Sequence, residues 1–128
     1  MATVTPKLTL TSTDLLSQNL NLSVSTSITA SHTSGLARAP ITSTAIGTPS
    51  GQVTLYTADD FAAIAYLYVK NTDSTATNYI YVYTAANNWL KIAGGEFAFL
   101  PLIADDTLKA YATTSGSIVE WMVFGTDQ

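Results

Sequence analysis

Apolar residues recur at every second position in two N-terminal segments of this 128-residue chain, at Leu8 and Leu10 and then at Leu20, Leu22 and Val24. Threonine, asparagine and serine fill the positions between them. A period of two places successive side chains on opposite faces of a β-strand. No segment sustains the 3.6-residue period of an amphipathic helix. The sequence therefore predicts an all-β fold.

The composition changes near residue 55, because all 13 aromatic residues lie from Tyr56 onward and 20 of the first 50 residues are serine or threonine. Threonine-rich strands with few large side chains suit a layer over another surface better than a core. We therefore expect residues 1–35 to form an extended arm or outer strands, and residues 36–128 to form a β-sandwich domain. The alternative is one compact sandwich that includes the N-terminal strands.

The remaining strands are expected at the short spacing of a sandwich of jelly-roll type. Three hairpins are expected among them, because short polar or glycine-containing loops such as Gly94-Gly95 separate consecutive strands. Their strands lie at 61–70 with 77–84, 89–92 with 96–100, and 107–113 with 118–124. In the last of these strands, Val119, Trp121 and Val123 share an apolar face that is expected to be core.

Tyrosines recur on one face of the first expected hairpin, at Tyr66 and Tyr68 and at Tyr79, Tyr81 and Tyr83. Such a face can stack on sugar rings, contact another protein or cover the protein's own core. These tyrosines and the N-terminal aliphatic residues make up the candidate interface, which is Leu8, Leu10, Leu20, Leu22, Val24, Tyr66, Tyr68, Tyr79, Tyr81 and Tyr83.

Few residues have the chemistry of an active site. The chain has no cysteine and one histidine, His32, in a serine- and threonine-rich segment. Its two glutamates, Glu96 and Glu120, have no spacing that indicates a carboxylate pair. The aspartate pairs at 59–60 and 105–106 fit turns, with calcium binding as the alternative. We expect no catalytic residue, no metal site, no cofactor and no enzyme activity.

Charge is sparse, at 11% of residues, and the net charge is −4. The five basic residues are scattered singly, which argues against nucleic-acid binding. The longest apolar run, 61–69, is far shorter than the roughly 20 residues of a membrane helix, so no membrane partner is expected. The N-terminal residues do not match a signal peptide, and we expect synthesis in a cytoplasm.

Five segments resemble the small virion structural proteins of tailed bacteriophages, especially those of marine and cyanobacterial hosts. They are Leu8–Ser12, Leu20–Ser25, Tyr66–Asn71, Gly95–Leu102 and Leu108–Ala112. The resemblance implies a β-sandwich or jelly-roll subunit of the virion, most specifically a capsid cement (decoration) protein. Its partners would be other virion proteins, the major capsid protein among them, and copies of itself.

Two alternatives remain open at this point. One is a tail or fibre component. The other is a carbohydrate-binding β-sandwich module, whose partner would be a host-surface glycan.

Overall fold

A computed structural model describes residues 2–47, 50–58, 60, 65–84, 87–102 and 106–126. Of these residues, 59% lie in strands and none lies in a helix, which confirms the all-β fold class. The strands are β1 (Ala2–Val4), β2 (Lys7–Ser12), β3 (Leu20–Ser25), β4 (Ile28–Ala30), β5 (His32–Thr33), β6 (Ala37–Ile41), β7 (Val53–Tyr56), β8 (Ala65–Asn71), β9 (Ile80–Thr84), β10 (Asn87–Ile92), β11 (Phe97–Leu102), β12 (Leu108–Ala112) and β13 (Ser117–Gly125).

The chain divides into two units, Met1–Ser31 and His32–Gln128. We call the described part of the first unit the ribbon and that of the second the body. The division lies four residues before residue 35, the expected end of the arm.

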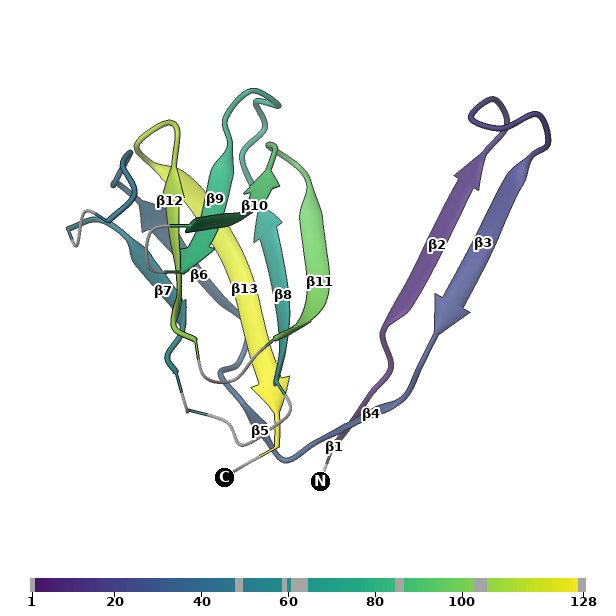
Figure 1. The fold of residues 1–128 in the computed structure, drawn as a ribbon, viewed down its shortest axis with the longest axis horizontal. Coiled ribbons are helices and arrows are strands. Elements are labelled where there is room, and N and C mark those ends of the chain that lie inside the picture. The colour runs from purple at the N-terminus through teal and green to yellow at the C-terminus, as the bar shows by residue number, and fades with distance from the viewer. Residues whose placement is uncertain are drawn as a thin grey trace. The chain divides into compact units, whose positions relative to one another are not determined.

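The ribbon is one long antiparallel hairpin, in which β1 pairs with β4 and β2 pairs with β3 (Figure 1). The register is the same in both pairs, since Ala2 faces Ala30 and Ser12 faces Leu20 with no residue gained or lost between. Among the described residues, no third strand pairs with these four. A hairpin of two strands is marginally stable alone in water, so the ribbon depends on further contacts.

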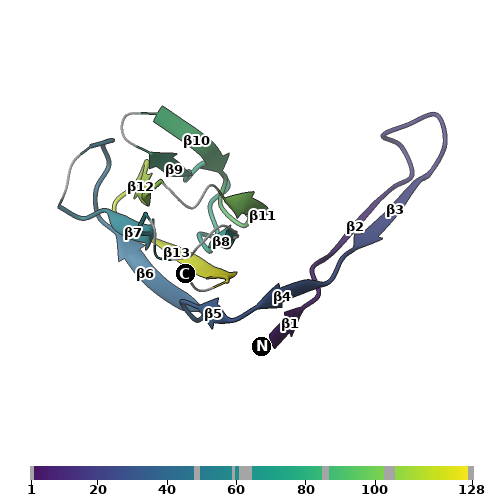
Figure 2. The same cartoon turned by 60° about the horizontal axis from the view of Figure 1, so that its bottom comes forward.

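The body contains two antiparallel sheets. One has four strands in the order β10-β9-β12-β7, and the other has five, in the order β11-β8-β13-β5 with β6 also paired to β13. In Figure 2, β9, β10 and β12 lie on one side of the body and β8, β11 and β13 on the other. Pro40 lies in β6, where an edge position tolerates its missing N–H.

The three hairpins expected in the body are wrong. β8 pairs with β11 and β13, whereas β9 pairs with β10 and β12. In the same way β10 and β11 lie in different sheets, as do β12 and β13. Each connecting loop therefore carries the chain from one sheet to the other. A turn reverses the chain direction equally well in both cases, so the turn residues do not reveal the partner strand.

Apolar side chains from both sheets form one core. The largest contributions include Leu67 and Val69 from β8, Ile80 and Val82 from β9, and Val123 from β13. Each of these side chains is 1% exposed or less. Alternation along the strands places them on the inner faces, which explains why both sheets are needed to exclude water.

Trp121 corrects part of the core prediction. Val119 and Val123 are buried as expected, but Trp121 on the same face is only half-buried and packs at the margin of the core. Trp121 lines a cavity of about 380 Å³, together with residues of β5 and β7. Among the described residues, β7 is the last strand of the four-stranded sheet at this side, so no further strand of that sheet covers the indole.

Asn71 joins the ends of the two sheets. Its buried side-chain Nδ2 donates to the carbonyl oxygens of Asn78 and Ile92, at 2.8 and 3.0 Å. Its Oδ1 accepts the N–H of Asp73 at 3.1 Å. Asn71 belongs to the five-stranded sheet and Ile92 to the four-stranded sheet, so one amide group links them. A Cβ on the nearby Gly94 would lie 2.2 Å from the carbonyl oxygen of Thr75, so only glycine fits there.

We expect Asn71→Ala to lower the free energy of unfolding by about 3 kcal/mol, because it leaves two carbonyls and one N–H without their partner. Chemical denaturation followed by tryptophan fluorescence measures the change. Asn87→Ala, at an exposed position of β10, is the matched control and should unfold like the parent. An Asn71→Ala protein as stable as the control would show that water replaces the lost hydrogen bonds.

Candidate interaction surfaces

The ribbon carries its aliphatic side chains on one face. Leu8 faces Val24, Leu10 faces Leu22 and Ser12 faces Leu20, and residues directly opposite each other in an antiparallel pair point to the same side. We call Leu8, Leu10, Leu20, Leu22 and Val24 the ribbon face. The opposite face pairs Lys7 with Ser25, Thr9 with Ser23 and Thr11 with Asn21. The N-terminal part of the candidate interface is therefore brought together in one stripe.

The ribbon face is open to solvent. Leu8, Leu10, Leu22 and Val24 are 41–50% exposed, and two further leucines at the tip, Leu15 and Leu16, are 70% and 55% exposed. Scattered exposed leucines are common, but a continuous stripe marks an interaction site. The tip itself is ordered by Ser12, whose Oγ accepts the N–H groups of Asp14 and Leu15.

The tyrosines of the candidate interface do not form one face. Tyr66 and Tyr68 lie on the outer side of the five-stranded sheet. Tyr81 and Tyr83 lie on the outer side of the four-stranded sheet, with Tyr79 just before it. The expectation of a shared tyrosine face is wrong because it depended on a hairpin between β8 and β9, which pair with other strands.

On the four-stranded sheet the tyrosines cover one another. The ring of Tyr81 stacks on Tyr111 with centroids 5.0 Å apart, and Tyr83 meets the same ring edge-on at 5.5 Å. The Tyr111 hydroxyl donates to Asn88 Oδ1 at 3.1 Å. Tyr83 and Tyr111 are buried, so these rings stabilise the sheet rather than offer an open platform.

On the five-stranded sheet an aromatic patch is partly open. The rings of Tyr66, Phe99 and Phe124 lie within 19° of parallel, with centroids 5.5–6.0 Å apart. Phe124 is buried, whereas Phe99 is 40% exposed and Phe97, on the same strand β11, is 63% exposed. Both phenylalanines lie in the strand expected at 96–100, but their exposure at the surface was not expected. Their alternation with Ala98 and Leu100 was the available signal.

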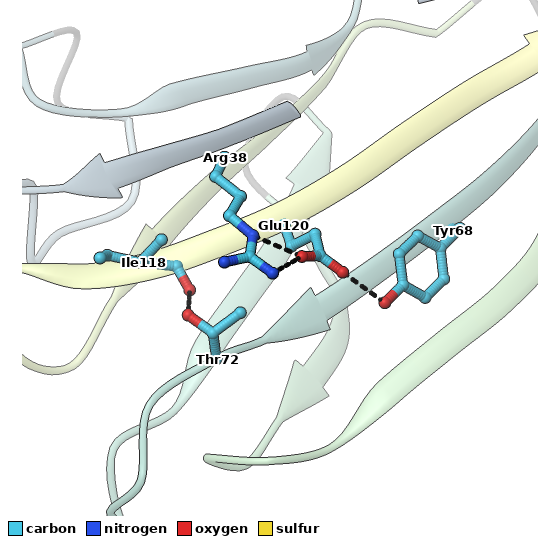
Figure 3. A network of polar contacts seen from close by, with 5 residues as sticks. All are labelled: Arg38, Tyr68, Thr72, Ile118 and Glu120. Carbon is cyan, nitrogen blue, oxygen red and sulfur yellow. Dashed lines mark hydrogen bonds and ion pairs between the residues drawn. The ribbon is translucent and has the colours of Figure 1, made fainter. Parts of the chain in front are cut away.

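Beside this patch, Glu120 of β13 holds a polar network that spans three strands (Figure 3). Arg38 of β6 donates from Nε to Glu120 Oε2 at 2.5 Å, and its Nη2 forms an ion pair with the same oxygen at 2.5 Å. The Tyr68 hydroxyl of β8 donates to Glu120 Oε1 at 2.8 Å. Glu120 is buried while the Arg38 side chain is 68% exposed, so salt in solution screens part of this attraction. The network holds the buried Glu120 carboxylate between Arg38 of β6 and Tyr68 of β8, and the Arg38 side chain remains largely exposed to solvent.

Two pKa values reflect this geometry. The hydrogen bond from Tyr68, followed by those from Arg38, holds the pKa of the Glu120 carboxyl below its usual range. The pKa of Tyr68 is raised, first by removal of the phenol from water and then by its hydrogen bond to the Glu120 carboxylate.

The polar residues considered for chemistry are dispersed. Glu96 Oε2 accepts the N–H of Ala93 in the turn before β11, and Glu120 makes the separate contacts described above. His32 lines the cavity beside Trp121, which Asp60 and Tyr56 also line. The expected aspartate pairs include residues 59 and 105, which lie outside the described residues, so calcium binding at either pair stays untested. Within the described ranges, no three histidine, aspartate or glutamate side chains gather as metal ligands would.

No segment among the described residues forms a helix long and apolar enough to cross a membrane. Comparison with protein-family models, with curated protein sequences and with solved structures found no significant match.

We expect Glu120→Gln to destabilise the protein at neutral pH and to do so less as the pH falls. The pKa of Glu120 is lower in the folded protein than in the unfolded chain. Its ionised form therefore stabilises the fold above the ordinary glutamate pKa, and this contribution disappears as the pH falls through the folded-state pKa. Urea denaturation of parent and variant over a pH series measures the difference.

Tyr68→Phe is the matched variant, because it removes the largest cause of the pKa shift and keeps the carboxylate. A double-mutant cycle of Tyr68→Phe and Glu120→Gln should give a coupling energy that shrinks in acid. If the difference in the free energy of unfolding between the parent and Glu120→Gln does not change with pH, this role for Glu120 is contradicted.

Proposed function

We propose that this chain is a structural subunit of a bacteriophage virion, and most specifically a capsid cement protein whose body is a β-sandwich of jelly-roll type. The ribbon face is the single observation that carries the proposal. A subunit that works alone gains nothing from an apolar stripe in water, whereas a subunit of an assembly covers the stripe with a neighbour.

The composition supports the same reading. Only 11% of the residues are charged, which leaves a large neutral surface to be covered by other subunits. A cement protein stabilises a shell through many weak contacts that repeat with the lattice, so no single contact needs high affinity.

The body offers a second contact surface on its five-stranded sheet. Phe97 and Phe99 are exposed there, and the ring of Phe99 stacks on the ring of Tyr66. Aromatic side chains are enriched in protein interfaces because they bury a large area with few rotatable bonds. We assign this aromatic patch to contact with the shell, and the ribbon to contact with neighbouring subunits.

A second candidate function has one specific observation in its favour. Near-parallel rings beside polar groups such as Arg38 and Glu120 are an arrangement that can stack on a sugar and hydrogen-bond to its hydroxyls. We rank this glycan-binding function below the cement function, because both oxygens of Glu120 already accept hydrogen bonds within the protein.

A variant lacking residues 1–31 should keep a cooperative melt and fail to bind empty capsids. The body has its own core, and the deleted unit supplies none of the residues of that core. Co-sedimentation with empty capsids from the phage that encodes the chain measures binding. The full chain with Thr9→Ala and Thr11→Ala, on the opposite face of the ribbon, is the control and should bind like the parent.

Undiminished capsid binding by the shortened chain would rule out the ribbon as a contact element. Binding of the full chain to purified tails but not to capsids would favour a tail or fibre component. Binding to neither, together with retention on a glycan array that Phe99→Ala abolishes, would favour the sugar-binding function.

A further inference from the structure

The strand β11 forms an open edge of the five-stranded sheet. It pairs with β8 along six residues without a register shift, and no strand among the described residues lies on its other side. The backbone N–H and C=O groups on that side therefore have no partner strand. Groups spaced along an extended backbone in this way bind the backbone of an added strand.

The hydrogen bonds to β8 show which residues of β11 point outward. The N–H of Asn71, at the end of β8, donates to the carbonyl oxygen of Glu96 at 3.0 Å, just before β11 begins. In an antiparallel pair, residues that bond to the partner strand alternate with residues that do not. In this register the N–H and C=O of Ala98 bond to β8. Those of Phe97 and Phe99, on either side of it, point away from the sheet.

The other edges of the two sheets are short, irregular or interrupted. β5 has two residues, β6 contains Arg38 and Pro40, and β7 and β10 each have a register shift against their partner strand. All of these features hinder pairing with a further strand. β11 has no charged residue and no register shift, and its one such feature is Pro101 near its end. Among the described strands, β11 is the edge best suited to pairing.

A cavity of about 470 Å³ lies beside this edge. Residues of β10 and of the start of β11 line it, and they include Leu90, Ile92 and Ala98, which pack in or against the core. β10 is the last described strand of the four-stranded sheet, so the cavity lies between the edge strands of the two sheets. A strand added to β11 directs every second side chain toward the inner side of its sheet, where an aliphatic side chain is removed from water.

The outer side of the same edge carries the aromatic patch. The side chains of Phe97 and Phe99 are 63% and 40% exposed. The remaining side chains of an added strand lie on this outer side and form cross-strand pairs with the two phenylalanines. The edge therefore fits an extended segment that has apolar side chains on both faces.

Pro101 disfavours a second copy of β11 as the added strand. It has the outward orientation of Phe97 and Phe99, but it has no N–H to donate. In an antiparallel pair of two β11 strands centred on Phe99, each Phe97 faces the partner copy's proline, and the C=O of Phe97 has no donor. A segment of a different protein can end before Pro101 and lose no hydrogen bond.

We propose that an extended segment of the capsid shell adds to β11 as a sixth strand of this sheet. This inference rests on the proposed function, because it names the way in which the shell binds at the aromatic patch. The N–H groups of Phe97 and Phe99 donate to carbonyl oxygens of the segment. One of its apolar side chains enters the cavity beside β10, and its outward side chains pack beside the two phenylalanine rings.

Hydrogen exchange of single backbone amides distinguishes an added strand from contact through side chains alone. In the free full-length chain, the outward N–H groups of Phe97 and Phe99 should exchange rapidly, whereas the N–H of Ala98 is protected by its bond to β8. Binding to empty capsids should slow exchange at Phe97 and Phe99 and change it little at Ala98. Capsid binding that leaves both phenylalanine amides unprotected would overturn the proposal.

A proline at residue 99 tests the same hydrogen bond by mutation. Phe99→Pro removes the outward N–H, and β11 already accepts a proline of this orientation at Pro101. Phe99→Ala is the matched variant, because it removes the same ring and keeps the N–H. Phe99→Pro should bind empty capsids severalfold more weakly than Phe99→Ala in co-sedimentation.

Cooperative melts of both variants show that they are folded. Equal capsid binding by the two folded variants would exclude strand addition at β11. If Phe99→Pro does not fold, the exchange measurement on the parent decides.

The outcome is separable from that of the proposed function. A parent that binds capsids without protection at Phe97 and Phe99 would keep the cement function and remove the added strand. A parent that does not bind capsids would remove both. Protection that appears without capsids and increases with the concentration of the chain would identify a second copy as the added strand, and would overturn its assignment to the shell.

Discussion

The unbroken register of the ribbon is the constraint from which its other properties follow. Because Lys7 faces Ser25 and Ser12 faces Leu20 with no register shift between them, every even-numbered residue of β2 and β3 lies on one side. One extra residue in either strand would move part of the aliphatic set to the other face and divide the stripe. Pairing geometry therefore decides whether these leucines and valines act as one surface or as scattered apolar side chains.

In the body, the loops and side-chain contacts that join the two sheets matter more than the pairing of strands within each sheet. Most of its consecutive strands lie in different sheets, so the loops between them run from one sheet to the other at the ends of the core. At one such end, the amide of Asn71 in β8 donates to the carbonyl oxygens of Asn78, just before β9, and of Ile92 in β10. Glu120 acts within one sheet, where it ties β13 to β6 and β8 on the outer surface. The open patch around Phe99 thus lies on a sheet braced by buried polar contacts.

Local patterns account for what the sequence could predict. The alternation at Leu8–Leu10 and Leu20–Val24 indicates two strands with one apolar face, and the structure pairs them with these side chains on the same side. Partner strands in the body could not be predicted, because Gly94-Gly95 suits a turn between sheets as well as a hairpin. The contact between Arg38 and Glu120 joins residues 82 positions apart, and no local signal announces it. Trp121 looks like a core residue because its neighbours are apolar, but its exposure depends on where the opposite sheet ends.

The separation of paired residues along the chain has a consequence for synthesis. β13 pairs with β5, β6 and β8, so the five-stranded sheet cannot close before residues 117–125 have left the ribosome. The ribbon uses only the first 31 residues and can close long before that, since local pairing is fast. Its aliphatic stripe is then presented while the body is still incomplete, and ribosomes that follow one another on a message hold several such stripes close together. The stripe is thus available for contacts before the body has finished folding.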